Sequence, residues 1–224
     1  MAETRAATGT DDPSSAAGDG SEPFMEAASD AGSRPPVPPS PIVVERARKA
    51  LDEHPLVLVG LMGVGKTTVG RQVALQLDLP FVDADEEIEA VSRMSVAELF
   101  EQFGEGEFRA LERRVIERLL REGGAMVLAT GGGAFMNDET RAAVLEGATT
   151  VWLRATLDVL VERTSRRSHR PLLRTGDPRE ILGRLIEERH PIYAEAHATI
   201  DSTGERRETV ASRVVHALAE RASA

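Results

Sequence analysis

The segment from Gly60 to Thr67 has the residue types and the spacing of a phosphate-binding loop. It reads Gly-Leu-Met-Gly-Val-Gly-Lys-Thr and fits the pattern in which a glycine, four variable residues, a glycine and a lysine precede a threonine or serine. Glycines let backbone N–H groups approach phosphate oxygens, the lysine supplies a positive charge, and the hydroxyl can bind Mg²⁺. The residues expected to bind nucleotide phosphates are Gly63, Val64, Gly65, Lys66, Thr67 and Thr68.

The lysine in this loop is informative because lysine is rare in the chain. Of the 27 basic residues, only Lys49 and Lys66 are lysines. A chain that otherwise uses arginine places a lysine where a compact charge fits and a planar guanidinium does not. We therefore expect Lys66 to be catalytic, at the phosphates that are transferred.

Two carboxylates, Asp83 and Asp85, directly follow the apolar pair Phe81-Val82. If the extended backbone continues, their side chains point to the same side. One carboxylate could hold Mg²⁺ through water, and the other could accept a hydrogen bond from an attacking hydroxyl. The alternative is that Asp85 only caps a helix beginning at Glu86.

A second group of candidate residues combines an arginine–glutamate pair with a run of glycines. Arg109 and Glu112 are three residues apart, so on a helix Glu112 can hold the guanidinium in one orientation. The alternative is an ordinary surface ion pair, which contributes little. The triple glycine Gly131 to Gly133 follows an apolar run and costs conformational entropy unless the backbone must approach something closely. A substrate in the crevice would explain all three glycines, whereas a tight strand-to-helix turn would explain one or two.

Two further arginine sites are less specific. Residues 163–174 contain five arginines and no acidic residue, which predicts a mobile lid that closes over phosphates. Arg170 is the best-placed charge in it because Pro171 stiffens the neighbouring backbone. Arg189 ends a predicted helix shortly before Pro191, where an arginine is also common for the helix dipole.

The elements that position these residues alternate along the chain. Apolar runs predict strands over 56–59, 81–82, 126–129, 150–153 and 198–201, and periodic stripes predict helices over 43–54, 66–77, 86–121 with a break near Gly104 and Gly106, 157–163, 178–189 and 208–221. Alternation of this kind predicts an α/β protein in which a five-stranded parallel sheet has helices on both faces. Ligands bind such sheets beyond the carboxyl ends of the strands, where the candidate residues lie.

Composition narrows the remaining choices. The chain has 224 residues, a formal net charge of −10 and no cysteine, which excludes disulfides and argues against a general nucleic-acid binder. No apolar run approaches the roughly 20 residues of a membrane span, and the start lacks the pattern of a signal peptide, so a cytoplasmic protein is expected. Residues 1–42, rich in Pro, Ala and Ser, predict a disordered acidic arm before a folded domain over 43–224, and the run Arg34 to Pro41 is expected not to be helical.

Six short segments occur in an order and at a spacing that resemble shikimate kinase. They are GLMGVGKTT, VDAD, GEGEFRALE, TGGGA, RPLL and ERHPIY, and they extend over most of the chain after Leu56. The resemblance implies a P-loop kinase fold of three layers, α/β/α, with a mobile lid over about 164–177. It also implies ATP-dependent phosphorylation of the 3-hydroxyl of shikimate with Mg²⁺, by a cytoplasmic monomer without nucleic-acid or membrane partners.

The resemblance also assigns residues. It implies that Thr67 and Asp83 serve the metal, that Asp85 binds substrate hydroxyls and acts as base, and that Arg170 closes on the phosphates. Arg163 would lie against adenine. The implied substrate-binding residues are Asp85, Arg109, Gly131, Gly132, Gly133 and Arg189.

Two other functions remain open at this stage. A related small-molecule kinase, for gluconate or a nucleoside monophosphate, would share the phosphate-binding loop but would not need two arginines for one carboxylate. A nucleotide-binding regulatory module would bind ATP without binding a small acid.

Overall fold

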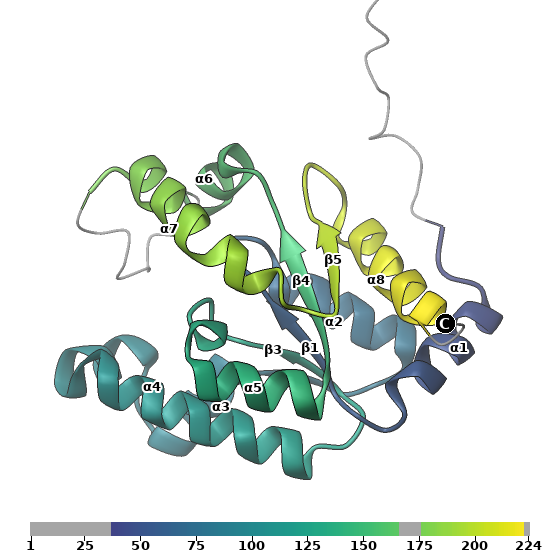
Figure 1. Cartoon of the computed structure of the whole chain (residues 1–224), viewed down its shortest axis with the longest axis horizontal. Helices are drawn as coiled ribbons and strands as arrows, with labels where there is room; N and C mark the ends of the chain where they lie inside the picture. The colour runs from purple at the N-terminus through teal and green to yellow at the C-terminus, as the bar shows by residue number, and fades with distance from the viewer. Residues whose placement is uncertain (1–36, 166–175, 222–224) are drawn as a thin grey trace, which may run out of the picture. The chain divides into compact units, whose positions relative to one another are not determined.

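The computed structural model describes residues 37–165 and 176–221, and at its centre lies a five-stranded sheet (Figure 1). The strand order is β2-β3-β1-β4-β5, and every neighbouring pair is parallel. The strands are β1 (Leu56–Val59), β2 (Phe81–Asp83), β3 (Val127–Ala129), β4 (Thr149–Arg154) and β5 (Ala198–Asp201). Side chains of β1 and β3 are buried throughout, as in sheets that helices cover on both faces. The predicted parallel sheet is confirmed.

Helices lie on both sides of this sheet and complete three layers (Figure 1). On one face α2 packs against β1 and β3, and α8 packs against both α1 and α2. On the other face α5 packs against β4, while α4 and α7 reach the short helix η1. The helices are α1 (Pro41–Leu51), α2 (Lys66–Leu77), α3 (Ala84–Ser92), α4 (Val96–Glu122), η1 (Ala134–Met136), α5 (Asp138–Gly147), α6 (Leu157–Ser165), α7 (Pro178–Tyr193) and α8 (Arg207–Arg221).

The strand register brings distant parts of the sequence to one edge of the sheet. Leu58 of β1 and Asp83 of β2 both pair with Ala129 of β3. The chain therefore leaves β1, β2 and β3 at the same level, and the segments that follow them meet there. This is the edge at which ligands of parallel sheets bind.

A second apolar cluster holds α3 against α4, apart from the main core around the sheet. Its buried residues are Ile88, Leu99, Phe108 and Val115. Helix α4 is interrupted at Gly104, where φ is 79° and ψ is 173°, close to the predicted break. Phe108 anchors the segment after this interruption, which fixes the start of the helical turn that carries Arg109.

Several helix predictions need correction. The helix predicted over 86–121 is two helices, α3 and α4, because Arg93 adopts a left-handed conformation with φ of 58° after α3 and Ser95 caps α4. Helix α1 begins at Pro41 and not at Val43, because Ser40 caps the helix and proline lacks an N–H that the first turn would leave unpaired anyway; the expectation that Pro41 is not helical is wrong. Helix α7 continues to Tyr193, past Pro191, rather than ending at Arg189. Helix α5 was not predicted at all, although Asn137 caps it.

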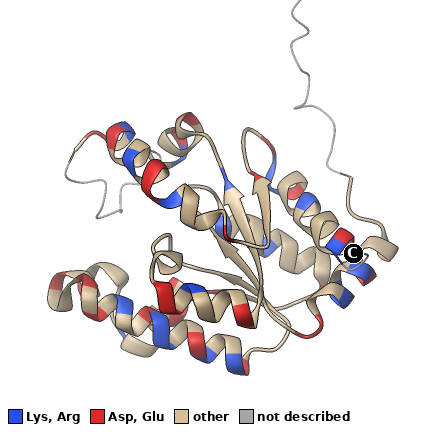
Figure 2. Ribbon diagram, in the orientation of Figure 1, with Lys and Arg blue, Asp and Glu red and all other residues tan. Residues whose placement is uncertain are grey.

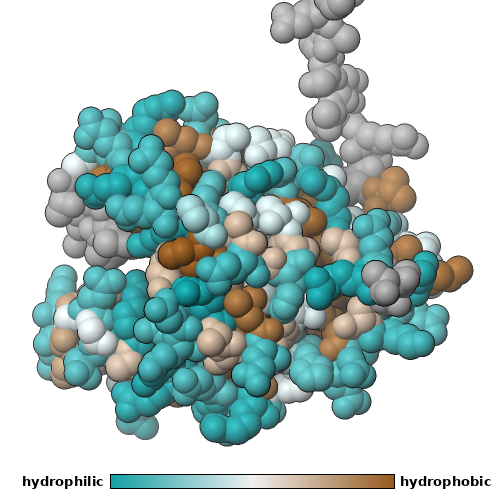
Figure 3. Space-filling model, in the orientation of Figure 1, coloured by the Kyte–Doolittle hydropathy of each residue, from teal (hydrophilic) through white to brown (hydrophobic). Residues whose placement is uncertain are grey.

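Parts of the sequence-based organisation lie outside the described residues. Residues 1–36 and 166–175 lie outside the described part of the chain. Most of the predicted arm, most of the predicted lid and Arg170 therefore stay predictions. Within residues 37–165 and 176–221, no helix combines the length and the apolar composition that crossing a membrane requires. Hydrophilic residues cover most of the face drawn in Figure 3.

Candidate active site

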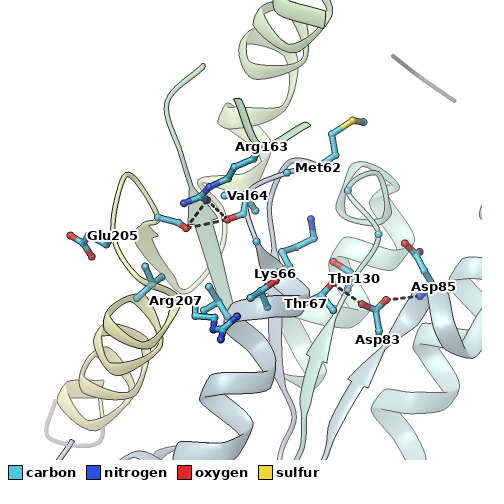
Figure 4. A pocket seen from close by; sticks show the side chains of 18 residues that line it. Met62, Val64, Lys66, Thr67, Asp83, Asp85, Thr130, Arg163, Glu205 and Arg207 are labelled. Carbon is cyan, nitrogen blue, oxygen red and sulfur yellow. Dashed lines mark hydrogen bonds between the residues drawn. The ribbon is translucent and has the colours of Figure 1, made fainter. Parts of the chain in front are cut away.

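The phosphate-binding loop lies between β1 and α2, as its sequence predicts (Figure 4). Gly63 has φ of +82°, and a Cβ there would lie 2.7 Å from Cγ2 of Thr164, so only glycine fits. Lys66 begins α2, and its ammonium group donates hydrogen bonds to the carbonyl oxygens of Gly60 at 2.7 Å and Leu61 at 3.1 Å. The side chain is thus curled over the loop at the helix N-terminus, where anions are stabilised.

A cavity of about 360 Å³ opens above this loop (Figure 4). Most of the residues that the sequence singles out line it together. These are Gly63, Val64, Gly65, Lys66, Thr67, Thr68, Asp83, Asp85, Gly131, Gly132 and Arg163. Arg109, Gly133 and Arg189 do not line the cavity itself but contact its wall, as described below.

Asp83 and Asp85 have separate positions in the structure. Asp83 Oδ2 accepts a hydrogen bond from Thr67 Oγ1 at 2.8 Å, and its Oδ1 accepts one from the Asp85 N–H at 3.1 Å. Asp83, not Asp85, therefore caps α3, which begins at Ala84 rather than Glu86. The alternative role of Asp85 as a helix cap is wrong. Both carboxylates line the cavity, although the backbone turns helical between them and does not continue as a strand.

The electrostatic surroundings of Asp85 favour its protonated form. Burial raises the pKa of Asp85, and the neighbouring Asp83 charge raises it further. Lys66 and Arg109 act in the opposite direction. The charges of Lys66 in the phosphate-binding loop and of Arg109 in α4 thus both act on Asp85. A carboxylate with a raised pKa is a better proton acceptor than an ordinary one.

Arg109 and Glu112 form a largely buried ion pair rather than an ordinary surface pair. Arg109 Nη1 donates to Glu112 Oε2 at 2.6 Å, and the Glu112 side chain is only 2% exposed. Burial raises the pKa of Glu112, and the charge of Arg109 opposes that rise. The Phe108 and Phe100 rings lie 5.1 Å and 5.9 Å from the guanidinium carbon, within cation–π range. The prediction that Glu112 holds this guanidinium is confirmed.

The triple glycine brings the backbone close to these charged side chains. A Cβ at Gly131 would lie 2.5 Å from Glu112 Oε1 and 3.1 Å from Asp85 Oδ1. One residue further, the Gly132 carbonyl accepts a hydrogen bond from Arg189 Nη1 at 3.0 Å. The loop after β3 therefore contacts both Arg189 of α7 and the acidic side chains of α3 and α4, Asp85 and Glu112.

Arg163 stands at the opposite end of the cavity. Its Nη1 donates to the Val64 carbonyl at 3.0 Å and to Ser202 Oγ at 3.3 Å, and Ser202 donates to the same carbonyl at 3.1 Å (Figure 4). Burial lowers the pKa of the guanidinium. Arg163 also lines the cavity.

Sequence reasoning missed several residues of this site. Ser202 and Glu205, from the segment between β5 and α8, and Arg207, the first residue of α8, line the cavity. Glu205 and Arg207 are labelled in Figure 4. The position of Ser202 directly after a predicted strand could have drawn attention to it. Tyr193, which donates a hydrogen bond to the Gly132 carbonyl, gave no local signal because it lies beyond the predicted end of its helix.

Comparison with known proteins identifies the family. The sequence model of the family described as shikimate kinase matches residues 62–219. A shikimate kinase of Brucella canis is 58% identical over 175 residues, which cover 78% of this chain and 87% of that protein. The chain belongs to the shikimate kinase family. A Mesorhizobium japonicum shikimate kinase is 54% identical over 168 residues, covering 75% of this chain and 82% of that one.

A solved structure agrees with this assignment. The shikimate kinase from Acinetobacter baumannii in complex with shikimate superposes with a TM-score of 0.73 at 35% identity, covering 77% of this chain and 96% of that chain. The P-loop kinase fold predicted from the sequence is confirmed. Members of this family use ATP to phosphorylate a hydroxyl of shikimate, and the chain is an enzyme of this kind; the two other open functions, a kinase of another small molecule and a regulatory module, are set aside.

Proposed function

We propose that the chain phosphorylates the 3-hydroxyl of shikimate in the cavity above the phosphate-binding loop, with Asp85 as the base. One observation carries the proposal: Asp85 lines the same cavity as Lys66, and it lies against Gly131, which also contacts the Glu112 carboxylate that holds Arg109. A hydroxyl held beside Asp85 would face the phosphates that Lys66 binds, while the acid group of the same molecule would reach the arginines. Positioning and charge neutralisation are the main requirements of phosphoryl transfer.

At the nucleotide end, we assign the phosphates to the loop amides of Gly63 to Thr68 and to the Lys66 ammonium. Arg163 is assigned to the adenine, because a guanidinium fixed along one edge leaves a flat face for stacking. Arg170 is assigned to the phosphates on the resemblance and the sequence alone.

Thr67 and Asp83 suit a magnesium ion that accompanies ATP. Among the described residues, no group of three or more His, Cys, Asp or Glu side chains could hold a metal. Mg²⁺ in kinases needs fewer protein ligands, because water and phosphate oxygens supply the others. The Thr67 hydroxyl and the Asp83 carboxylate, 2.8 Å apart, are such a pair. When bound there, the ion would neutralise charge on the transferred phosphates.

At the substrate end, Arg109 and Arg189 are assigned to the carboxylate. The two side chains come from α4 and α7 and meet at Gly131 to Gly133, where the Gly132 carbonyl binds Arg189 and Gly133 lies against Arg109. Two guanidinium groups around a side-chain-free loop leave room for a small acid and match the two oxygens of its planar carboxylate. Asp85 would accept the proton of the attacking hydroxyl.

The proposal extends to the state of the enzyme. We expect a monomer in the cytoplasm, with shikimate and ATP as its partners and neither nucleic acid nor membrane. The formal net charge of −10 argues against a nucleic-acid-binding surface, and acidic and basic residues are interspersed along the helices (Figure 2). Light scattering on the purified chain tests the monomer, since a mass near twice the 24.2 kDa of one chain would contradict it.

A coupled ADP-release assay tests the proposed reaction. The full chain is assayed with ATP and Mg²⁺ against shikimate, gluconate and nucleoside monophosphates, and phosphorus NMR identifies the position of the new phosphate. We expect turnover with shikimate, a phosphate on the 3-hydroxyl, and loss of activity with EDTA. Good turnover on another acceptor with none on shikimate would refute the proposal.

A further inference from the structure

One carbonyl group of the substrate loop accepts hydrogen bonds from two side chains of α7. Arg189 Nη1 lies 3.0 Å from the Gly132 oxygen, and the Tyr193 hydroxyl lies 2.5 Å from it. The two donors are four residues apart and so share one face of the helix. The Gly132 oxygen thus uses both of its lone pairs on α7.

The Tyr193 side chain is held rigidly. It is 1% exposed, and its ring stacks with those of Trp152, at 5.9 Å between ring centres, and Phe135, at 6.2 Å. Burial raises the pKa of Tyr193 to about 12, so its hydroxyl remains a donor at neutral pH. A rigid ring with one fixed donor is well suited to hold a carbonyl in place.

The Gly132 segment needs such an anchor because it has no side chain and lies against the phosphate-binding loop. A Cβ at Gly132 would be only 3.2 Å from the Met62 N–H nitrogen. A shift of this peptide would therefore alter the wall between the nucleotide end and the substrate end. It would also change the direction in which Arg189 is held, because that side chain binds the same oxygen.

We propose that Tyr193 is a positioning residue, whose hydroxyl fixes the Gly132 carbonyl so that Arg189 uses one nitrogen for that carbonyl and presents the others to the substrate carboxylate. The inference rests on the proposed role of Arg189 in substrate binding. Tyr193 itself does not contact the substrate. Without its hydroxyl, Arg189 would be the remaining α7 donor to that oxygen, and its guanidinium would have to hold the loop and bind the acid at once.

The substitution Tyr193→Phe tests the proposal because it removes the hydroxyl and keeps the ring. Loss of one net hydrogen bond corresponds to a change of about 3- to 10-fold. We expect the KM for shikimate to rise by that factor while the KM for ATP stays within about twofold. A purely structural tyrosine would lower the melting temperature without this split. An unchanged KM for shikimate, or an equal rise for both substrates, would overturn the assignment.

A matched control lies on the same helix. The His190 ring packs edge-on against Trp152 at 4.9 Å between ring centres, and no bond from it to the Gly132 oxygen is found among the described residues. His190→Gln should leave the KM for shikimate within about twofold. A rise as large as that of Tyr193→Phe would show that any softening of α7 has this effect, and the proposal would fail.

A double-mutant cycle then separates this inference from the proposed function. Shikimate affinity is measured by calorimetry for Tyr193→Phe, Arg189→Ala and the double variant. If Tyr193 acts through Arg189, its substitution should add less than about twofold once Arg189 is absent, whereas independent roles would give additive losses and refute the coupling. A wild-type chain that neither binds nor phosphorylates shikimate would refute the proposed function instead.

Discussion

The substitution Gly133→Ala probes the substrate end of the site with one methyl group. Gly133 has φ of −107° and ψ of −11°, which alanine adopts without strain. Its added Cβ would lie 2.6 Å from the Arg109 Cζ and 2.8 Å from Nη1, and closer still to Nη2. The methyl group therefore acts on the guanidinium rather than on the backbone.

The size of the effect follows from the distance that Arg109 must move. Carbon and nitrogen atoms need roughly 3.5 Å, so the guanidinium has to shift by about 1 Å. This shift disturbs the 2.6 Å bond to Glu112 that orients the group. A misplacement of about 1 Å can cost about 100-fold in rate, or about 2.7 kcal/mol. We expect kcat/KM for shikimate to fall by about 10- to 100-fold, with the KM for ATP nearly unchanged.

Steady-state kinetics with each substrate varied in turn measures this split, and thermal melts measure stability. Gly106→Ala is the matched control, because Gly106 lies on α4, the helix that carries Arg109, and a Cβ there meets no atom within 4 Å. The control should keep its kinetics and gain about 0.5 to 1 kcal/mol of stability. If Gly133→Ala leaves kcat/KM for shikimate unchanged, or weakens ATP equally, Arg109 does not bind the acid as proposed.

Three other predictions follow from the charged residues. Lys66→Ala should lower kcat by at least about 100-fold with little change in far-UV circular dichroism, and Lys66→Arg should not restore it, because a planar fork does not fit the loop. Arg163→Ala should raise the KM for ATP about tenfold and leave that for shikimate unchanged; equal losses would contradict its place at the adenine. Burial and the Asp83 charge raise the pKa of Asp85, so the folded state holds this proton more tightly than the unfolded chain does. Stability therefore falls as pH rises from the ordinary pKa of 3.8 through the raised pKa. Asp85→Asn should therefore lower kcat by at least about 100-fold yet stabilise the fold at neutral pH by about 1 kcal/mol, a gain that thermal melts should find lost near pH 3.

The fold was largely predictable because its signals are local. Helix α2 spans Lys66–Leu77 as predicted, since the loop motif fixes its start and the apolar stripe fixes its length. The parallel sheet followed from buried runs such as Leu56–Val59. Helix α5 was missed because only Thr140 and Val144 are buried in it, too few to give a clear stripe. The end of α7 was misplaced because Pro191 signals a helix end, although tertiary contacts carry the helix on to Tyr193.

The site was predictable where a residue stands in a motif and not where the fold alone brings it in. Lys66 and Asp83 lie in or beside short motifs at strand ends. Ser202 reaches the Val64 carbonyl across 138 positions of sequence, and Tyr193 reaches Gly132 across 61. No local pattern encodes such contacts, because they depend on how the helices and strands pack.

The aromatic stack beside the substrate loop has a practical consequence. Trp152 is the sole tryptophan of the chain, and its indole is 4% exposed and lies 5.9 Å from the Tyr193 ring. His190 packs edge-on against the same indole. Intrinsic tryptophan fluorescence of the enzyme thus originates from one indole next to α7. Stopped-flow mixing could follow small movements of that helix in real time, on unlabelled protein.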